Sequence, residues 1–356
     1  MDSGQQLRLA LVGCGAITEG SHLPAVLASY GMELAALCDA NRSRAEMLRK
    51  RMGLNVPVFA DHRQLIGQAD AAIVATPNHL HAAVAVDLLT AGMHVLCEKP
   101  LASTREDCRR MVKAARSSSS ILAVGYVQRF LPSTRLTHQL LRSGDLGKLH
   151  SFEYEFGTAG GWAPLSGYNL SRSTSGGGVL VVSGSHFADR MFCLFDRVSV
   201  RQFHDDSRGG VEANCIGQFD VAVGEQNFEG TVTLSKTHLL SNRLRIHAEK
   251  GVLEAREGQK GSVTLYPAGS DLRHEIHAPG GGDDDPFRVQ LEDFVRAVQT
   301  RSEPMVNGEE GSKSVDLMLS CYEMAQPLEE PWVDVTLSRI ATSIGQAQQL
   351  AGGVAE

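Results

Sequence analysis

Two glycines that follow an apolar run are the first residues whose spacing indicates chemistry. Leu9-Ala10-Leu11-Val12 leads into Gly13-Cys14-Gly15, a pattern typical of a strand, a tight turn and the start of a helix. In such a turn Gly13 permits the reversal, and Gly15 lets the backbone approach a pyrophosphate at the helix N-terminus. Thr18 replaces the third glycine of the dinucleotide fingerprint, so the motif depends on its context.

An acidic residue at the end of the next expected strand bears on the choice of nucleotide. Asp39 stands roughly 20 residues beyond the turn, where a carboxylate accepts bonds from the adenosine ribose and repels a 2′-phosphate. It therefore favours NAD. Arg42 is close enough to attract that phosphate, so NADP stays open, as does a simple turn role for Asp39. The backbone of Ala16 and Ile17 completes the expected pyrophosphate site.

The elements that position this turn alternate between short apolar runs and helical stretches, which predicts right-handed βαβ units. Ala71–Ala75 is apolar at every position, as expected for a parallel strand covered on both faces. Residues 1–128 are therefore predicted to form a Rossmann domain with a doubly wound parallel sheet. Its predicted strands are Leu7–Val12, Leu34–Cys38, Val56–Phe59, Ala71–Ala75, Val95–Cys97 and Ile121–Val124.

After about Phe130 the strands alternate in polarity, which is typical of an antiparallel sheet with one buried face. Gly176-Gly177-Gly178 precedes an apolar helix from about Val179 to Phe195. Residues 129–335 are predicted to form an α+β domain with a large, mostly antiparallel sheet, and 336–356 a tail. Predicted strands are Leu149–Phe156, Asn214–Val223, Asn227–Leu234 and Arg243–Ala248, and helices at about 287–300 and 312–325 are expected to pack back on them.

The composition argues against nucleic-acid and membrane partners. Lys and Arg total 34 against 41 Asp and Glu, which gives a formal charge of −7. The chain therefore lacks the excess of basic residues that nucleic acids and acidic membranes attract. The first residues lack a basic, apolar leader, and no later apolar run approaches the ~18 residues of a membrane span. We expect a cytoplasmic protein whose seven cysteines are reduced.

No metal is expected. The acidic loop Gly280–Asp285 has adjacent aspartates, which in a glycine-rich loop are usually solvated. His79 and His81 stand two positions apart and cannot share one helix face.

Three segments together resemble the glucose-fructose oxidoreductase, inositol dehydrogenase and MocA family: the glycine turn, Thr76-Pro77-Asn78-His79-Leu80-His81, and Glu98-Lys99-Pro100. The likeness extends over nearly the whole chain. It implies that Pro77 lies against a nicotinamide and that Lys99, before a cis proline, hydrogen-bonds the reacting hydroxyl. An ammonium at that place lowers the cost of proton loss as hydride departs. The cofactor-lining set is then Thr76, Pro77, Asn78, His81, Glu98 and Lys99.

The chain departs from the family where proton transfer is expected. The family carries Asp-x-x-x-His on the helix after the triple glycine, whereas here Val182 precedes His186 at that spacing. An imidazole base normally needs a partner that fixes its tautomer. The missing aspartate therefore leaves the role of His186 open.

Three outcomes remain. His186 acts as base with a hydroxyl from Ser183, Ser185 or Tyr168 as its orienter; or Lys99 acts through Tyr168 while His186 only bonds the substrate; or catalysis has been lost. We favour the first, because the triple glycine brings this helix toward the nicotinamide. The expected catalytic residues are Lys99, His186 and Tyr168.

Arg129 follows the last Rossmann strand and is placed either to reach a substrate anion or to tie the two domains together. The expected substrate-binding set is Lys99, Arg129, Tyr168, Ser185 and His186.

The leading function is a reversible NAD(P)-dependent dehydrogenase or ketoreductase of a sugar, cyclitol or sugar derivative. A redox-neutral NAD-dependent glycosidase or epimerase is the second reading, and it would produce no net NADH. A dinucleotide-binding protein without catalysis is the third, supported by Val182. The alternating strands leave one face of the second sheet partly uncovered, and the resemblance implies that such faces meet in a homodimer or homotetramer.

Overall fold

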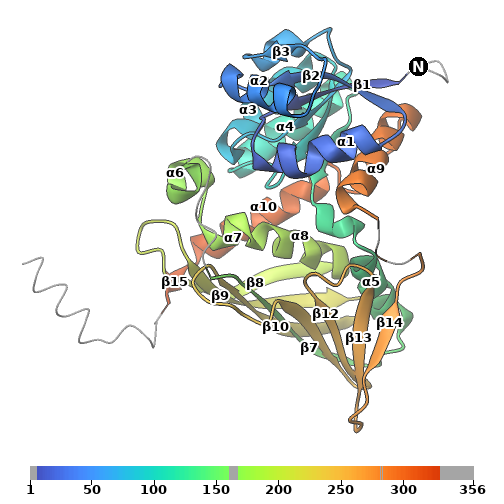
Figure 1. The fold of residues 1–356 in the computed structure, drawn as a ribbon. Coiled ribbons are helices and arrows are strands. Elements are labelled where there is room, and N and C mark those ends of the chain that lie inside the picture. The colour runs from blue at the N-terminus through green and yellow to red at the C-terminus, as the bar shows by residue number, and fades with distance from the viewer. Residues whose placement is uncertain (1–5, 160–166, 281, 283, 329–356) are drawn as a thin grey trace, which may run out of the picture.

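The computed structural model describes residues 6–159, 167–280, 282 and 284–328. The chain is built around two sheets (Figure 1). A six-stranded sheet lies between helices at the N-terminal end, and a nine-stranded sheet carries helices on the face turned toward it. The predicted architecture, a Rossmann domain followed by an α+β domain, is confirmed.

The N-terminal sheet consists of β1 Leu7–Val12, β2 Met32–Cys38, β3 Val58–Phe59, β4 Ala71–Val74, β5 His94–Glu98 and β6 Leu122–Gly125. All its pairs are parallel, in the order β3-β2-β1-β4-β5-β6. β4, β5 and β6 are buried along their whole length, as helix layers on both faces require. The order reverses between β1 and β4, and such folds bind ligands at the carboxyl ends of the strands there.

The helices of this domain are α1 Leu23–Ala28, α2 Arg42–Arg51, α3 Asn78–Thr90 and α4 Arg105–Ser118, with a 3-10 turn η2 at His62–Leu65. A π-helical turn, η1 at Thr18–His22, precedes α1. Thr18 begins it, and its hydroxyl donates to the Gly13 carbonyl at 2.5 Å. The side chain that replaces the third glycine therefore ties the helix back to the turn.

The second sheet consists of β7 Leu149–Gly157, β8 Arg197–Asp205, β9 Asn214–Val223, β10 Gln226–Ser235, β11 Arg243–Ala248, β12 Gly251–Arg256, β13 Ser262–Pro267, β14 His274–His277 and β15 Gln326–Pro327. Its order is β14-β13-β12-β11-β7-β10-β9-β8-β15, antiparallel except for β7 with β10 and β8 with β15. Helices cover one face only (Figure 1). The other face carries charged pairs, such as Arg201 with Asp220.

Between the sheets lie η3 Val127–Phe130, α5 Pro132–Ser143, η4 Gly167–Leu170, α6 Arg172–Ser175, α7 Val179–Val182 and α8 Gly184–Leu194. The prediction of one helix from Val179 to Phe195 is wrong in one respect, because the chain turns at Ser183. There the His186 N–H donates to the Ser183 carbonyl at 3.3 Å instead of to Val182, four positions back. The Val182 carbonyl is thereby left to accept another donor.

The last two helices, α9 Pro286–Thr300 and α10 Gly308–Glu323, return toward the first domain. The expectation that both pack on the second sheet is wrong for α9, whose Leu291, Phe294 and Val295 share an apolar core with β1 and β2. The chain before α10 also joins β6, where the Val124 N–H donates to the Val306 carbonyl at 2.9 Å. The predicted domain boundary between residues 128 and 129 therefore separates the two sheets. It does not separate the two apolar cores, because α9 contributes to the core of the first domain.

A buried ion pair joins the two parts. Arg129 on η3 places Nη2 2.8 Å from Oδ1 of Asp189 on α8, and Nη1 3.5 Å from Oε2 of Glu310 on α10. Burial opposes the charged form, but the Asp189 carboxylate raises the pKa of Arg129. These contacts give the Arg129 guanidinium the interdomain role, one of the two that the sequence left open, while its contact with substrate stays a prediction.

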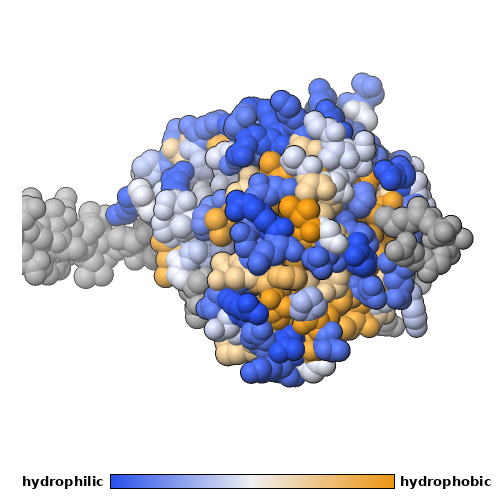
Figure 2. Space-filling model, turned by 90° about the horizontal axis from the view of Figure 1, so that it is seen from above, coloured by the Kyte–Doolittle hydropathy of each residue, from blue (hydrophilic) through white to orange (hydrophobic). Residues whose placement is uncertain are grey.

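Viewed from the N-terminal end, the surface is mainly hydrophilic with scattered apolar areas (Figure 2). Leu27, Tyr30 and Met47 are among the exposed apolar side chains of this domain, and single exposed residues of this kind are usual on protein surfaces. In the described part of the chain, no helix combines the length and apolarity that a membrane crossing needs.

Replacing Arg129 with Met leaves the Asp189 carboxylate buried without its partner. We expect the free energy of unfolding to fall by about 3 to 5 kcal/mol, measured by urea unfolding at pH 7. Arg142→Met breaks the exposed pair with Asp196 and is the matched control, with an expected cost below about 1 kcal/mol. Equal losses in the two variants would contradict the central role of the buried pair.

Candidate active site

The glycine turn has the geometry that the sequence predicts. Gly13 has a φ of +93°, and a Cβ there would lie 2.4 Å from the Ala75 carbonyl oxygen, so only glycine fits. At Gly15 no described atom lies within 4 Å of the place of a Cβ. Ala16 and Ile17 are exposed at the start of the helix, where backbone N–H groups have no partner within the helix.

Asp39 is held beside this turn. Its Oδ2 accepts the Cys14 N–H and its Oδ1 accepts the Asn41 N–H, both at 2.8 Å. The nearby cation is Arg44, whose Nη1 lies 3.8 Å from Asp39 Oδ2, whereas Arg42 is exposed and pairs within its own helix. Arg44, rather than the predicted Arg42, is therefore the arginine next to the expected ribose position.

These residues fit a dinucleotide. The turn offers open space and backbone N–H groups, which a pyrophosphate needs, and each Asp39 oxygen keeps a further lone pair for a ribose hydroxyl. Thr76 and Pro77 follow β4 at the same edge of the sheet. The Thr76 hydroxyl is buried without a hydrogen-bond partner among the described residues, so it has unused capacity for a ligand.

Glu98, the last residue of β5, has a carboxylate held on both oxygens. Oε1 lies 2.8 Å from His22 Nε2, and Oε2 accepts the Lys99 N–H at 3.0 Å. Burial opposes ionisation, but the contact with His22 and the charge of Lys99 hold the pKa of Glu98 below its ordinary value. A Cβ on Gly125 of β6 would lie 3.0 Å from Oε1. Glu98 is thus enclosed and fixes the backbone where Lys99 begins.

Lys99 extends from the first domain to the second. The Lys99–Pro100 peptide bond is cis, as the resemblance implied. The ammonium donates to the Val182 carbonyl at 2.9 Å, the acceptor left by the break between α7 and α8. Burial lowers the pKa of Lys99, Glu98 opposes this effect, and the charge of Lys236 adds to it. The ammonium therefore releases its proton more readily than that of a surface lysine.

His186 lies near the start of α8. Burial and the charge of Lys99 lower its pKa to about 3, so the ring is neutral at pH 7. Its Nδ1 is buried without a hydrogen-bond partner among the described residues, and its ring lies edge-on to Tyr126 with centroids 6.5 Å apart. The structure thus shows a packed, neutral imidazole without the carboxylate that Val182 replaces.

Tyr168 on η4 is partly buried, which raises its pKa, and the charge of Glu98 contributes to the rise. The phenol therefore stays protonated and lies within electrostatic range of Glu98. Lys99, His186 and Tyr168, the predicted catalytic set, are brought into one region. Ser185 is fully buried, and its hydroxyl has no partner within the described ranges.

The segment after β4 is fixed by its polar side chains. His81 is buried, with Nδ1 2.9 Å from the Pro100 carbonyl and Nε2 2.8 Å from the Thr76 carbonyl. The ring therefore lies between two loops and contacts both, while the contact of His81 with the cofactor stays a prediction. Asn78 Nδ2 donates to the Ser175 carbonyl at 2.6 Å, so α3 is tied to α6.

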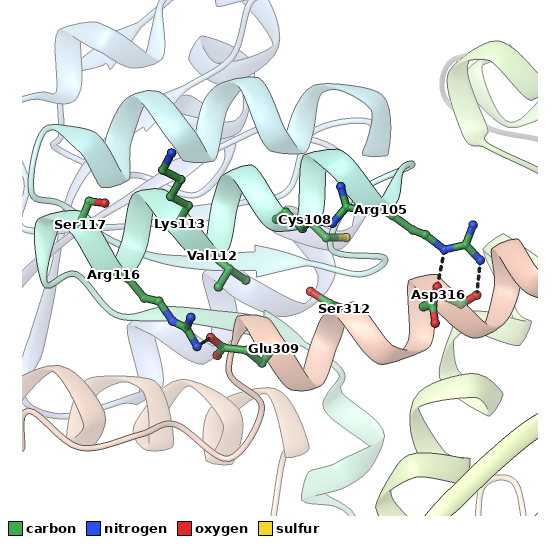
Figure 3. Close-up of a pocket in the computed structure, with 10 residues that line it drawn as sticks. Arg105, Cys108, Val112, Lys113, Arg116, Ser117, Glu309, Ser312 and Asp316 are labelled. Atoms are coloured by element: carbon green, nitrogen blue, oxygen red, sulfur yellow. Dashed lines mark hydrogen bonds and ion pairs between the residues drawn. The ribbon is translucent and has the colours of Figure 1, made fainter.

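A cavity of about 600 Å³ lies elsewhere, between α4 and α10 (Figure 3). Arg105 pairs with Asp316 across it, and Arg116 pairs with Glu309. None of its lining residues belongs to the predicted site. The groove is therefore a charged contact between two helices rather than the place of the chemistry.

Two aspartates of the acidic loop interact with the start of α9. Asp285 caps α9 by accepting the Phe287 N–H at 3.2 Å, and Asp284 pairs with Arg288. Among the residues that the structure describes, no three His, Cys, Asp or Glu side chains are grouped to hold a metal ion.

Three residues of this region were not predicted from the sequence. Arg44 stands two positions from the predicted Arg42, and only the helix geometry decides between them. His22 comes four residues after Thr18, which suggests a shared buried helix face, but its partner Glu98 is 76 positions away. Lys236 follows β10 with no motif around it.

The comparisons with known proteins decide the family. The model of an oxidoreductase family with an NAD-binding Rossmann fold matches residues 7–126, and the model of the C-terminal alpha/beta domain of that family matches residues 138–335. The chain belongs to this oxidoreductase family. The predicted resemblance to glucose-fructose oxidoreductase, inositol dehydrogenase and MocA is confirmed, as are the NAD-binding Rossmann domain and the class of oxidoreductase.

This family member is similar over nearly its whole length to curated relatives. It is 27% identical over 343 residues to D-glucoside 3-dehydrogenase of Escherichia coli (strain K12), covering 90% of this chain and 95% of that one. It is 28% identical over 336 residues to 1,5-anhydro-D-fructose reductase of Ensifer adhaerens, covering 89% and 96%. Aldose-aldose oxidoreductase from Caulobacter crescentus shares the fold, with a TM-score of 0.79, 24% identity and coverage of 90% and 97%.

Asp39→Ala should weaken NAD binding much more than NADP binding, because it removes an acceptor for the ribose and a charge that repels a 2′-phosphate. Dissociation constants from fluorescence titration with both nucleotides measure this. Arg44→Ala should instead weaken NADP more, and the exposed Arg42→Ala should change neither. Equal losses for NAD and NADP in Asp39→Ala would remove Asp39 from the ribose site.

Proposed function

We propose that this oxidoreductase moves hydride reversibly between NAD(P) and a secondary alcohol or ketone of a sugar, cyclitol or sugar derivative. The observation that carries the proposal is Lys99, which follows β5 at the carboxyl edge and reaches the second domain through its 2.9 Å bond to Val182. The nicotinamide, when bound, supplies the hydride acceptor or donor. The relatives named as a glucoside dehydrogenase and an anhydrofructose reductase support this substrate class.

In this proposal Lys99 handles the proton. Its lowered pKa makes the neutral amine accessible, so the amine takes the hydroxyl proton as the alcohol is oxidised, and the ammonium returns it in the reverse direction. The Glu98 carboxylate fixes the lysine backbone through its 3.0 Å bond to the Lys99 N–H. It also keeps a compensating negative charge close to the ammonium.

His186 then serves as a neutral hydrogen-bonding group and not as the main base. A pKa of about 3 makes the imidazole a weak proton acceptor at pH 7, and Nδ1 has no orienter within the described residues. Tyr168 stays protonated and supplies a hydroxyl donor in the region of Lys99 and His186. Of the three outcomes left open by the sequence, these observations favour Lys99 acting with Tyr168.

The same residues bear on the competing readings. A redox-neutral glycosidase or epimerase would use the same nicotinamide edge but release no NADH, so NADH production from a free sugar separates the two. A protein without catalysis would bind NADH and turn over no sugar or polyol. The placement of the half-buried Lys99 ammonium across the two domains argues against this third reading, because partial desolvation of a charge has a cost.

We further propose a cytoplasmic homodimer or homotetramer. All seven cysteines are free, which suits a reducing compartment. The helices lie on one face of the second sheet (Figure 1), and its strands carry exposed charged pairs such as Arg201 with Asp220. A sedimentation-velocity profile of a pure monomer at micromolar concentration would overturn the oligomeric part.

Lys99→Met should lower kcat by about 10²-fold or more on any sugar that the wild type oxidises, because the group acts mainly on the transition state. The dissociation constant for NADH should stay within about twofold, an energy change well below 1.4 kcal/mol. Lys113→Met, on the exposed side of α4, is the control. Turnover by Lys99→Met within about threefold of wild type would exclude Lys99 as the proton-transfer group.

Val182→Asp places a carboxylate at the position from which the family orients its histidine. The added charge should raise the pKa of His186 from about 3 toward the neutral range, so His186 protonates as the pH falls through that new value. We expect a new acidic limb in the kcat profile, with the matching shift in the histidine ring signals by NMR.

Val182→Asn has the same shape without the charge and should show neither change. His186→Gln in the Val182→Asp background should remove the new limb. A limb that persists without His186 would assign the titration to another group.

A further inference from the structure

Lys236 is a charged residue on the apolar side of the second sheet. Along β10, Phe228, Val232 and Leu234 are buried on the helix-covered face, and alternate positions share a face. The ladder continues past β10, since the Lys236 N–H donates to the Ala213 carbonyl at 2.8 Å. Lys236 therefore continues the face of Leu234, toward the helices and the first domain.

That end of β10 lies beneath the start of α8. A Cβ on Gly184 would lie 2.5 Å from Leu234 Cδ1, and Gly184 is two residues before His186. From the opposite side Lys99 reaches the same place through its bond to Val182. Lys99 and Lys236 are close enough for the charge of Lys236 to lower the pKa of Lys99. The two lysines therefore approach the same end of β10 from opposite sides.

The charge at this place is only partly balanced. Glu98 offsets Lys99 but is turned toward His22 and the Lys99 backbone. Burial lowers the pKa of Lys236, and in the described part of the chain no carboxylate opposes that effect. Two converging cations without an anion between them are unfavourable in a partly desolvated place. An anionic ligand removes this repulsion and forms charge-assisted hydrogen bonds.

We propose that Lys236 determines substrate specificity by binding an anionic group, a carboxylate or a phosphate, on the sugar whose reacting hydroxyl meets Lys99. This inference rests on the proposed function. A neutral polyol would give Lys236 only hydroxyl acceptors and leave the excess charge in place. A lysine supplies a point charge on a flexible stem, which suits either anion.

The test compares three related sugars, D-glucose, D-glucuronate and D-glucose 6-phosphate, as substrates with NAD and as ligands of the NADH complex. We expect kcat/KM for at least one anionic sugar to exceed that for glucose by about 10-fold or more, since charge-assisted bonds are worth more than neutral ones. Lys236→Met should abolish this ratio, and Lys236→Arg should retain most of it. Lys250→Met, at an exposed position in the second domain, is the control. Preference for glucuronate or for the phosphate identifies the anion.

A second measurement distinguishes binding from a structural role. Without the neighbouring charge, the pKa of Lys99 should rise. The pH below which kcat for oxidation falls, because Lys99 becomes protonated, should therefore be higher in Lys236→Met and unchanged in Lys236→Arg. If wild type and Lys236→Met oxidise all three sugars in the same ratio, the inference is overturned while the proposed function stands.

If none of the three sugars is oxidised, calorimetry of the NADH complex with D-glucuronate and D-glucose 6-phosphate still decides the inference. Anion affinity that is lost in Lys236→Met and kept in Lys250→Met supports it. Affinity that is equal in the two variants, or absent from the wild type, refutes it.

Discussion

The site depends on one buried carboxylate. Glu98 ends the strand that precedes Lys99, and each of its oxygens has a fixed partner, His22 on one side and the Lys99 N–H on the other. A desolvated carboxylate is stable only when it is held in this way. His22 is the last residue of the π turn that continues the glycine loop. The same contact therefore connects the expected pyrophosphate site to Lys99, the proposed proton-transfer residue.

The position of Lys99 also depends on the break between α7 and α8 at Ser183. An uninterrupted helix would use the Val182 carbonyl within its own ladder, and the Lys99 ammonium would then lose its acceptor. The break leaves the Val182 carbonyl free to accept from Lys99. The backbone of Val182 therefore binds the lysine, although its side chain cannot orient His186 as an aspartate would. This arrangement is consistent with chemistry that relies less on a charged histidine pair.

Local pattern was enough to predict the fold. Runs that are apolar throughout, such as Ala71–Val74, indicate a strand between two helix layers, and alternating runs such as Asn214–Val223 indicate a sheet with one covered face. The residues near the lysine were predicted because motifs mark them. Lys236 and His22 were missed, because what makes them relevant is a contact with residues far away in sequence. The destination of α9 was missed for the same reason: its apolar face fits either domain.

The path of α9 has a consequence for how such proteins are recombined. Leu291, Phe294 and Val295 complete the apolar core around β1 and β2, although in the chain they follow every strand of the second sheet except β15. A fragment that ends at residue 128 would leave that core open to water and prone to aggregate. The nucleotide-binding domain is therefore encoded by two separate stretches of the sequence. A chimera that takes its cofactor preference from a relative needs three crossovers, so that the segment around residues 286–307 moves together with the N-terminal domain.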